Sequence, residues 1–264
     1  MRTRVAAARQ WTGNGIEAVR RGAVTEARAC FAKASSQLPT DHNIIANVAR
    51  THFHEGQFEL AIAEMNRAVE INRDDPELLV ELGEYYLAAG QLQAASVQAE
   101  KSLNKNYRLA SAWLLKGQIH AASGDHRQAL GDFQKAAGID AARDDVQLHI
   151  VQSYRSLGDP LRALSAIETL LEKYPADQQP NQALVEKSSA LLQLNQHSAA
   201  IETLKLAIRN DPTPEMFHAL ANAQELSGRN TTALQTLDEA KQRFPGDYLV
   251  AERTQSTASN HQIR

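Results

Sequence analysis

The sequence predicts an all-α fold in which antiparallel helix pairs stack along the chain into a right-handed α-solenoid, or superhelix. Two residue types recur at a fixed spacing of 34 residues over the first five copies of a repeat. No stretch alternates apolar and polar side chains with the period of two that a half-buried strand requires. Hydrophobic residues make up 43% of the 264 residues but aromatic residues only 5%, which suits several thin cores better than one large core.

A glycine and an alanine mark the repeat. The glycines are Gly22, Gly56, Gly90, Gly124, Gly158 and Gly228, with Asn195 at this position in the sixth copy. The alanines are Ala27, Ala61, Ala95, Ala129, Ala163, Ala200 and Ala233. Together they define a single array of seven units, which span residues 8–41, 42–75, 76–109, 110–143, 144–177, 181–213 and 214–247. For residues 248–264 the sequence predicts a short capping helix and a polar tail.

The third unit shows why each repeat should form two helices. Asp75 is a suitable N-cap and Pro76 a suitable first helical residue, and leucines at helical spacing follow them. Gly90 can end this helix in the left-handed conformation, after which a second helix runs through Ala95. Residues 175–182 are polar, contain two prolines and include a three-residue insertion, so a longer loop between repeats is expected there.

At this point the chain resembles the tetratricopeptide repeats, whose units have a large residue, Leu-Gly, Tyr, Ala, Phe and Pro at fixed places in 34 residues. The matching residues are Trp11, Gly15, Ala27, Phe31, Ala34 and Pro39 in the first unit, Leu79, Leu82, Gly83, Tyr86 and Ala95 in the third, and Trp113, Gly117, Ala129, Phe133 and Ala136 in the fourth. The fifth and sixth units depart from the pattern at Gln147, Leu170 and Lys187. The resemblance covers residues 8–247.

Composition excludes several classes of protein. A net charge of −3 argues against a general nucleic-acid binder. The single cysteine, Cys30, cannot form an intramolecular disulfide and is expected to be a small packing residue. No apolar run approaches the roughly 18 residues of a membrane helix, so no membrane segment is predicted.

The expected compartment is the cytoplasm. The alternative is the periplasm or export, if an upstream signal has been removed, because many similar bacterial proteins are exported.

The charge is divided unevenly along the chain. Residues 1–50 carry eight basic and three acidic side chains, whereas residues 51–100 carry two basic and ten acidic ones. This division indicates either solvated helix faces of opposite sign or a surface that steers a charged partner.

No pattern of catalytic residues stands out, so we expect no enzyme activity, cofactor or metal site. His52 and His54 lie two residues apart, which on a helix places them on different faces and prevents joint chelation. The glycines recur as helix stops and form no phosphate-binding loop. No Ser/His/Asp arrangement can be recognised from the sequence alone.

The resemblance implies that the first helix of each pair lines a concave groove in which partners lie. Groove positions form three rows along the array. Row one holds Thr12, Ala46, Val80, Leu114, Leu148, Val185 and His218, and row two holds Ile16, Arg50, Glu84, Gln118, Gln152, Ser189 and Asn222. Row three holds Val19, Phe53, Leu87, Ala121, Arg155, Leu192 and Glu225. We expect a protein partner to contact Asn47, Arg50, Phe53, Val80, Glu84, Leu87, Leu114, Gln118, Leu148, Gln152 and Arg155.

The partner expected here is an extended peptide or an amphipathic helix, because apolar anchors and amide side chains alternate along these rows. A subgroup of the family clamps the C-terminal carboxylates of chaperones with Lys, Asn and Arg, and of the corresponding residues here only Asn47 fits. Glu84 would repel a carboxylate. The leading hypothesis is therefore a non-catalytic interaction scaffold. The alternatives are an accessory module of an enzyme complex, for example of a transferase, and an RNA-binding helical repeat.

Overall fold

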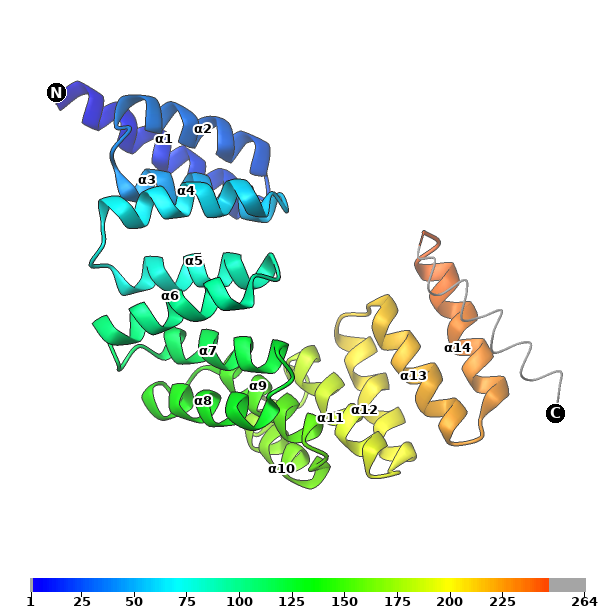
Figure 1. Ribbon diagram of the computed structural model, residues 1–264. Coiled ribbons are helices and arrows are strands. Elements are labelled where there is room, and N and C mark those ends of the chain that lie inside the picture. The colour runs from blue at the N-terminus through cyan, green and yellow to red at the C-terminus, as the bar shows by residue number, and fades with distance from the viewer. Residues whose placement is uncertain (1, 247–264) are drawn as a thin grey trace. The chain divides into compact units, whose positions relative to one another are not determined.

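The computed structural model describes residues 2–246, and within this range every regular element is a helix. The helices are α1 (Arg2–Arg20), α2 (Val24–Gln37), α3 (His42–His54), α4 (Phe58–Ile71), α5 (Pro76–Ala88), α6 (Leu92–Lys105), α7 (Ala110–Ala122), α8 (His126–Ile139), α9 (Asp144–Ser156), α10 (Pro160–Leu171), α11 (Asn181–Gln193), α12 (His197–Asn210), α13 (Pro214–Leu226) and α14 (Asn230–Arg243). They pack in consecutive antiparallel pairs (Figure 1), which confirms the predicted all-α repeat fold. The capping helix and tail predicted for residues 248–264 lie outside the described residues.

The chain divides into two compact units. Unit 1 ends at Ala141 and contains α1 to α8, and unit 2 begins at Ala142 and contains α9 to α14. Within each unit, the second helix of a pair also contacts the first helix of the next pair. The apolar core is accordingly a series of local clusters, such as the one around Met65 and Leu82 in unit 1 and the one around Ile167 and Leu184 in unit 2.

The helix stops adopt the backbone conformation that the repeat demands. The φ angles of the six repeat glycines lie between +73° and +84°, and Asn195 takes a φ of +58° at the same position. Beyond Gly90, the N–H of Gln91 donates to the Tyr86 carbonyl at 2.8 Å, which satisfies one of the free carbonyls at the helix end. The chain therefore turns sharply into the second helix of each pair.

The helix starts and the long loop also follow the local sequence. The Asp75 carboxylate accepts a hydrogen bond from the Glu77 N–H at 3.0 Å, with Pro76 at the first helical position. In unit 2, α10 ends at Leu171 and α11 begins at Asn181, so the insertion lies in an irregular connection between two repeats.

Small and large residues alternate where the helices of a pair cross. The seven repeat alanines are fully buried. The buried rings of Phe31 and Phe133 lie against Gly15 and Gly117, in the first helix of the same pair. Cys30 is also buried, among the packing residues of α2. The alanines allow close approach of the backbones, and the rings fill the space that the glycines leave open.

Candidate functional site

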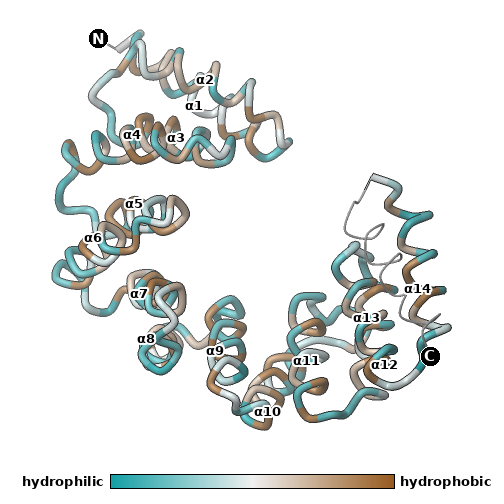
Figure 2. Tube along the Cα trace, turned by 45° about the vertical axis from the view of Figure 1, so that its right-hand side comes forward, coloured by the Kyte–Doolittle hydropathy of each residue, from teal (hydrophilic) through white to brown (hydrophobic). Residues whose placement is uncertain are grey.

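The first helices of unit 1 lie side by side and present a common face, here called the first-helix face, made by α1, α3, α5 and α7. Figure 2 shows α3 and α5 on one side of unit 1 and their partners α4 and α6 on the other. Residues of α3 contact residues of α5, and α5 contacts α7. The groove positions predicted for the first four repeats all lie on these four helices.

The structure contradicts one part of the predicted groove, the apolar anchors of row one. Val80 is 2% exposed, Leu114 5% and Leu148 8%. The surrounding structure covers these three side chains, whereas Thr12, Val185 and His218 of the same row are half-buried. The three covered side chains therefore belong to the core and offer little surface to a partner.

Arg50 and Asn47 belong to a polar link between two repeats. The Arg50 guanidinium donates two hydrogen bonds to the Glu81 carboxylate, at 2.9 and 2.6 Å, and a third to the Asn47 side-chain oxygen at 2.8 Å. Burial disfavours the charge of Arg50, but the bond and charge of Glu81 outweigh it, so the pKa of the guanidinium is raised. This bidentate geometry joins α3 firmly to α5.

Next to this link, Phe53 stacks on Tyr85 with a centroid separation of 4.4 Å and an interplanar angle of 13°. Phe58, at the start of α4, also lies near Phe53, with the ring centroids 5.5 Å apart. Burial, followed by the nearby charge of Glu81, raises the pKa of the Tyr85 phenol, which therefore stays neutral. Phe53 is half-buried, so its ring is held in place while part of it remains accessible.

In unit 1, the apolar groove side chains that remain open lie in rows two and three. Ile16 is 42% exposed and Val19 38%, both on α1, and Leu87 on α5 is half-buried like Phe53. The predicted polar residues Glu84 and Gln118 are exposed and half-buried, respectively. The first-helix face of unit 1 thus combines partly open apolar groups with polar ones.

In unit 2, Gln152 and Arg155 converge on one buried carboxylate. Gln152 donates to Glu186 at 2.8 Å, and the Arg155 Nε lies 3.3 Å from the other Glu186 oxygen. The Glu186 side chain is only 11% exposed. Both predicted residues are therefore committed to the packing of α9 against α11.

His149 lies beside this group. Burial lowers the pKa of His149 and outweighs the hydrogen bond with Gln152 and the attraction of two nearby carboxylates. The folded protein thus prefers neutral His149, whereas an unfolded histidine protonates near pH 6.5.

We expect unit 2 to lose stability as the pH falls from about 6.5 toward the lowered pKa of His149. In this window the unfolded chain binds more protons than the folded one, so stability rises with pH. Thermal melts of the wild type and of His149→Gln at about pH 7.5 and about pH 5.5 measure this. The decrease should be smaller in His149→Gln, and His54→Gln, an exposed histidine on α3, is the control. Equal decreases in all three proteins would contradict the assignment.

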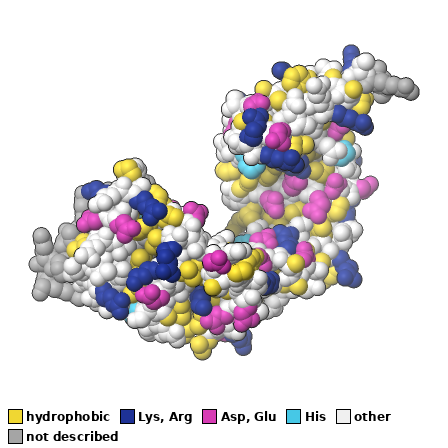
Figure 3. All heavy atoms as spheres, turned by 180° about the vertical axis from the view of Figure 1, so that it is seen from behind, with side chains coloured by type: hydrophobic (Ala, Val, Ile, Leu, Met, Phe, Trp, Pro, Cys, Tyr) yellow, Lys and Arg dark blue, Asp and Glu magenta, His cyan; other side chains and the backbone are white. Residues whose placement is uncertain are grey.

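The uneven charge of the sequence is partly neutralised between repeats. Arg28 of α2 pairs with Glu55 at 3.0 Å, and Arg50 pairs with Glu81. Each pair joins a basic residue of the first 50 to an acidic residue of the next 50. Figure 3 shows side chains of both signs beside one another on unit 1. Part of the charge division therefore serves contacts between helix pairs.

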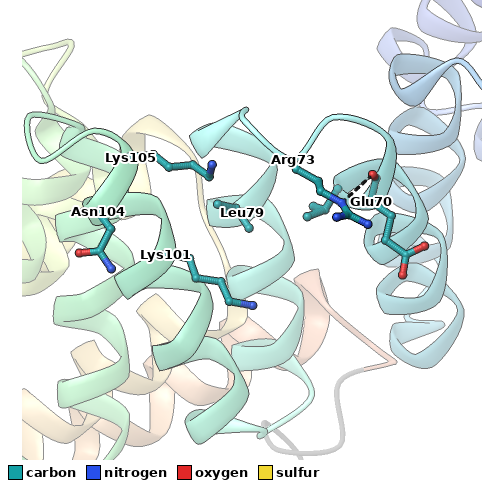
Figure 4. Close-up of a pocket in the computed structure, with 7 residues that line it drawn as sticks. Glu70, Arg73, Leu79, Lys101, Asn104 and Lys105 are labelled. Atoms are coloured by element: carbon teal, nitrogen blue, oxygen red, sulfur yellow. Dashed lines mark hydrogen bonds between the residues drawn. The ribbon is translucent and has the colours of Figure 1, made fainter.

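Two pockets lie away from the predicted groove residues. One, of about 490 Å³, lies on unit 1 between α4, α5 and α6, and Figure 4 shows Lys101, Lys105 and Arg73 around Leu79. The other, of about 420 Å³, lies on unit 2 between α12, α13 and α14 and includes Phe217. None of the residues predicted to contact a partner lines either pocket.

The histidines that occupy the tyrosine position of their repeats have local partners. His52 Nδ1 lies 2.7 Å from the Gln57 side-chain oxygen, and His120 Nδ1 lies 2.7 Å from the Asp132 carboxylate.

Among residues 2–246, no three His, Cys, Asp or Glu side chains are grouped so that they could hold a metal ion. None of the helices described here is long and apolar enough to cross a bilayer.

Comparison with known proteins identifies the architecture. A family model described as tetratricopeptide repeat matches residues 78–145, 148–215 and 185–248, and a second model of the same description matches residues 18–79. The chain belongs to the tetratricopeptide repeat family. A curated relative, superkiller complex protein 3 of Mus musculus, is 24% identical over 238 residues, which are 88% of this chain and 15% of that protein.

Solved structures show the same fold. A tetratricopeptide repeat protein from Parabacteroides merdae has a TM-score of 0.73 and 12% identity, over 96% of this chain and 99% of that one. The Cut9–Hcn1 hetero-tetramer of the APC/C has a TM-score of 0.62 and 16% identity, over 95% and 42%. YrrB, described as a tetratricopeptide repeat protein with an unusual peptide-binding site, has a TM-score of 0.53 and 18% identity, over 72% and 97%.

The tetratricopeptide repeat register does not by itself reveal the carboxylates Glu81 and Glu186. They occupy equivalent places in the third and sixth repeats, and each lies 31 residues after an arginine, Arg50 or Arg155. A search for basic and acidic residues at this second spacing would have found both links. The three groove rows omit this position because it lies beside them on the helix.

Proposed function

We propose that this tetratricopeptide repeat protein is a non-catalytic scaffold that binds a segment of a partner protein on the first-helix face of unit 1. The observation that carries the proposal is the set of partly open apolar side chains there, namely Ile16, Val19, Phe53 and Leu87. Such side chains give affinity by removing apolar area from water. Arg50, Glu84 and Gln118 lie beside them and can bond polar groups of the same segment.

The chemistry of this face suits an amphipathic helix or an extended peptide. A partner would place apolar side chains against Phe53 and Leu87 and polar groups toward Glu84. A protein partner is also supported by the relatives, because one is described as having a peptide-binding site and two are named as parts of complexes. In a more specific form of the same proposal, the partner protein is a subunit of an enzyme complex and this chain is its accessory module.

Photo-cross-linking from the first-helix face tests the proposal. A benzoylphenylalanine at Leu87 should give cross-links to one protein, and the cross-linked segment is identified by mass spectrometry. The control position is Leu60 on α4, which is 53% exposed on the other side of the helix pair. The same cross-links from both positions, or cross-links to RNA from Leu87, would contradict the proposal.

We expect Leu87→Glu to weaken binding of the identified partner at least about tenfold, since a charge would have to be buried against its apolar surface. Leu60→Glu should change the dissociation constant less than about twofold. Titration calorimetry measures both values. Circular dichroism should show the same helicity in both variants, and unchanged affinity in folded Leu87→Glu would contradict this binding surface.

A further inference from the structure

Three lysines occupy the same position in the first, third and fourth repeats. They are Lys33, Lys101 and Lys135, each 25 residues after the first residue of its unit. In the first repeat the Lys33 ammonium lies 4.2 Å from the centroid of Trp11, and in the fourth Lys135 lies 4.1 Å from that of Trp113. At these two places the lysine covers a tryptophan face, an attractive cation–π contact.

The third repeat lacks this tryptophan. Leu79 stands at the equivalent position, and the pocket of about 490 Å³ lies against it. Val69 of α4 forms the other apolar part of the lining. Within residues 2–246 Lys101 has neither an ion pair nor a hydrogen bond, so its ammonium group is available. The third repeat thus has the lysine and an adjoining space, but no aromatic ring at the tryptophan position.

Cationic groups dominate the rim of the pocket. Figure 4 shows Lys101 and Lys105 on one side of Leu79 and Arg73 on the other, with the Glu70 carboxylate pointing away. Arg73 Nε donates to the Glu70 backbone carbonyl at 3.2 Å. Lys105 pairs with the exposed Asp74 at 2.8 Å. An acidic group of a ligand that enters the pocket would therefore meet positive charge.

The fourth repeat also shows how an indole is held at this position. There the Trp113 Nε1 donates a hydrogen bond to the Tyr107 backbone carbonyl at 2.9 Å. Arg73 precedes Leu79 by the same number of residues, so its backbone occupies the corresponding place beside the pocket. An indole of a ligand in this pocket would therefore meet a lysine and a backbone carbonyl, the two kinds of group that contact Trp113.

We infer that the pocket over Leu79 binds an aromatic side chain of a partner peptide, with an acidic residue next to it in that peptide. The ring completes the cation–π contact that Lys101 lacks, and the acidic residue contacts Arg73 or Lys105. The equivalent pocket of unit 2 is not a second copy of this site, because Phe217 stands in place of Leu79 and Glu239 in place of Lys101. This site lies on α4 to α6, apart from the groove residues proposed above.

A short peptide tests the inference directly. The probe is a blocked Asp-Trp-Asp tripeptide with 5-fluorotryptophan, whose ¹⁹F line broadens on binding to the full chain. We expect saturable binding that weakens with added salt. Unlabelled Asp-Leu-Asp and Asn-Trp-Asn should compete at least about fivefold less well than unlabelled Asp-Trp-Asp. Equal competition by the leucine peptide would overturn the inference.

Two variants locate the binding site. Leu79→Trp places the chain's own indole under Lys101, as in the first and fourth repeats, and should abolish probe binding. Lys101→Gln should weaken binding about fivefold or more, whereas Lys33→Gln, the same change beside a filled position, should leave it unchanged. If Leu79→Trp does not fold, the comparison of Lys101→Gln with Lys33→Gln decides. Equal binding by these two glutamine variants would overturn the assignment.

Discussion

Leucine in place of Ala129 should lower the free energy of unfolding by about 1–3 kcal/mol. Ala129 lies in α8, has no exposed surface, and is one of seven alanines at the crossing of the paired helices. The added methyl groups have no free space at this crossing, so α7 and α8 must move apart or the leucine must leave its preferred rotamers. Chemical denaturation measures the loss.

The control for this change is Ala63→Leu. Ala63 is exposed on α4, where leucine and alanine have similar helix propensities. Its effect should stay within about 0.5 kcal/mol of zero. A midpoint for Ala129→Leu that matches those of the wild type and of the control would show that the crossing site is not tightly packed.

Alanine in place of Gly117 should also destabilise the protein by about 1–3 kcal/mol. A Cβ atom at Gly117 would lie 2.5 Å from Cε1 and 2.6 Å from Cδ1 of the Phe133 ring. That ring is 1% exposed and cannot swing aside without displacing other core residues. The clash therefore outweighs the gain in helix propensity that alanine normally brings over glycine.

Gly131 offers a matched comparison, because it lies inside α8 and nothing stands within 4 Å of the Cβ position. Gly131→Ala should stabilise the protein by up to about 1 kcal/mol, so the same chemical change should have opposite signs at the two glycines. Phe133→Leu in the Gly117→Ala background should recover part of the loss. Stabilisation by Gly117→Ala would mean that the ring and the backbone of α7 are not in contact.

The helix ends could be predicted from the sequence because local residues determine them. A positive φ is readily adopted by glycine and tolerated by asparagine, so six glycines and Asn195 mark the stops whatever surrounds them. The N-cap at Asp75 and the burial of the repeat alanines likewise follow from short-range geometry.

The candidate site was harder to predict because it depends on neighbouring repeats. The repeat register gives the direction in which Val80, Leu114 and Leu148 point, but not how far the adjacent helix covers them. Long side chains add a second difficulty, because several rotamers of Arg50 and Arg155 satisfy the same backbone. The 31-residue spacing marks Glu81 and Glu186 as candidate partners, and the packed structure shows that the arginines reach them.

The links between repeats have a consequence for the order of the units. The seven helix pairs share one repeat register, but the partners of Arg50 and Gln152 are particular to their places in the chain. If the third and fourth repeats exchanged places, Arg50 would face the position of Leu115 instead of Glu81 and would lose its carboxylate. The second unit therefore favours the third as its successor, and a protein with these repeats exchanged should be less stable than this one of identical composition.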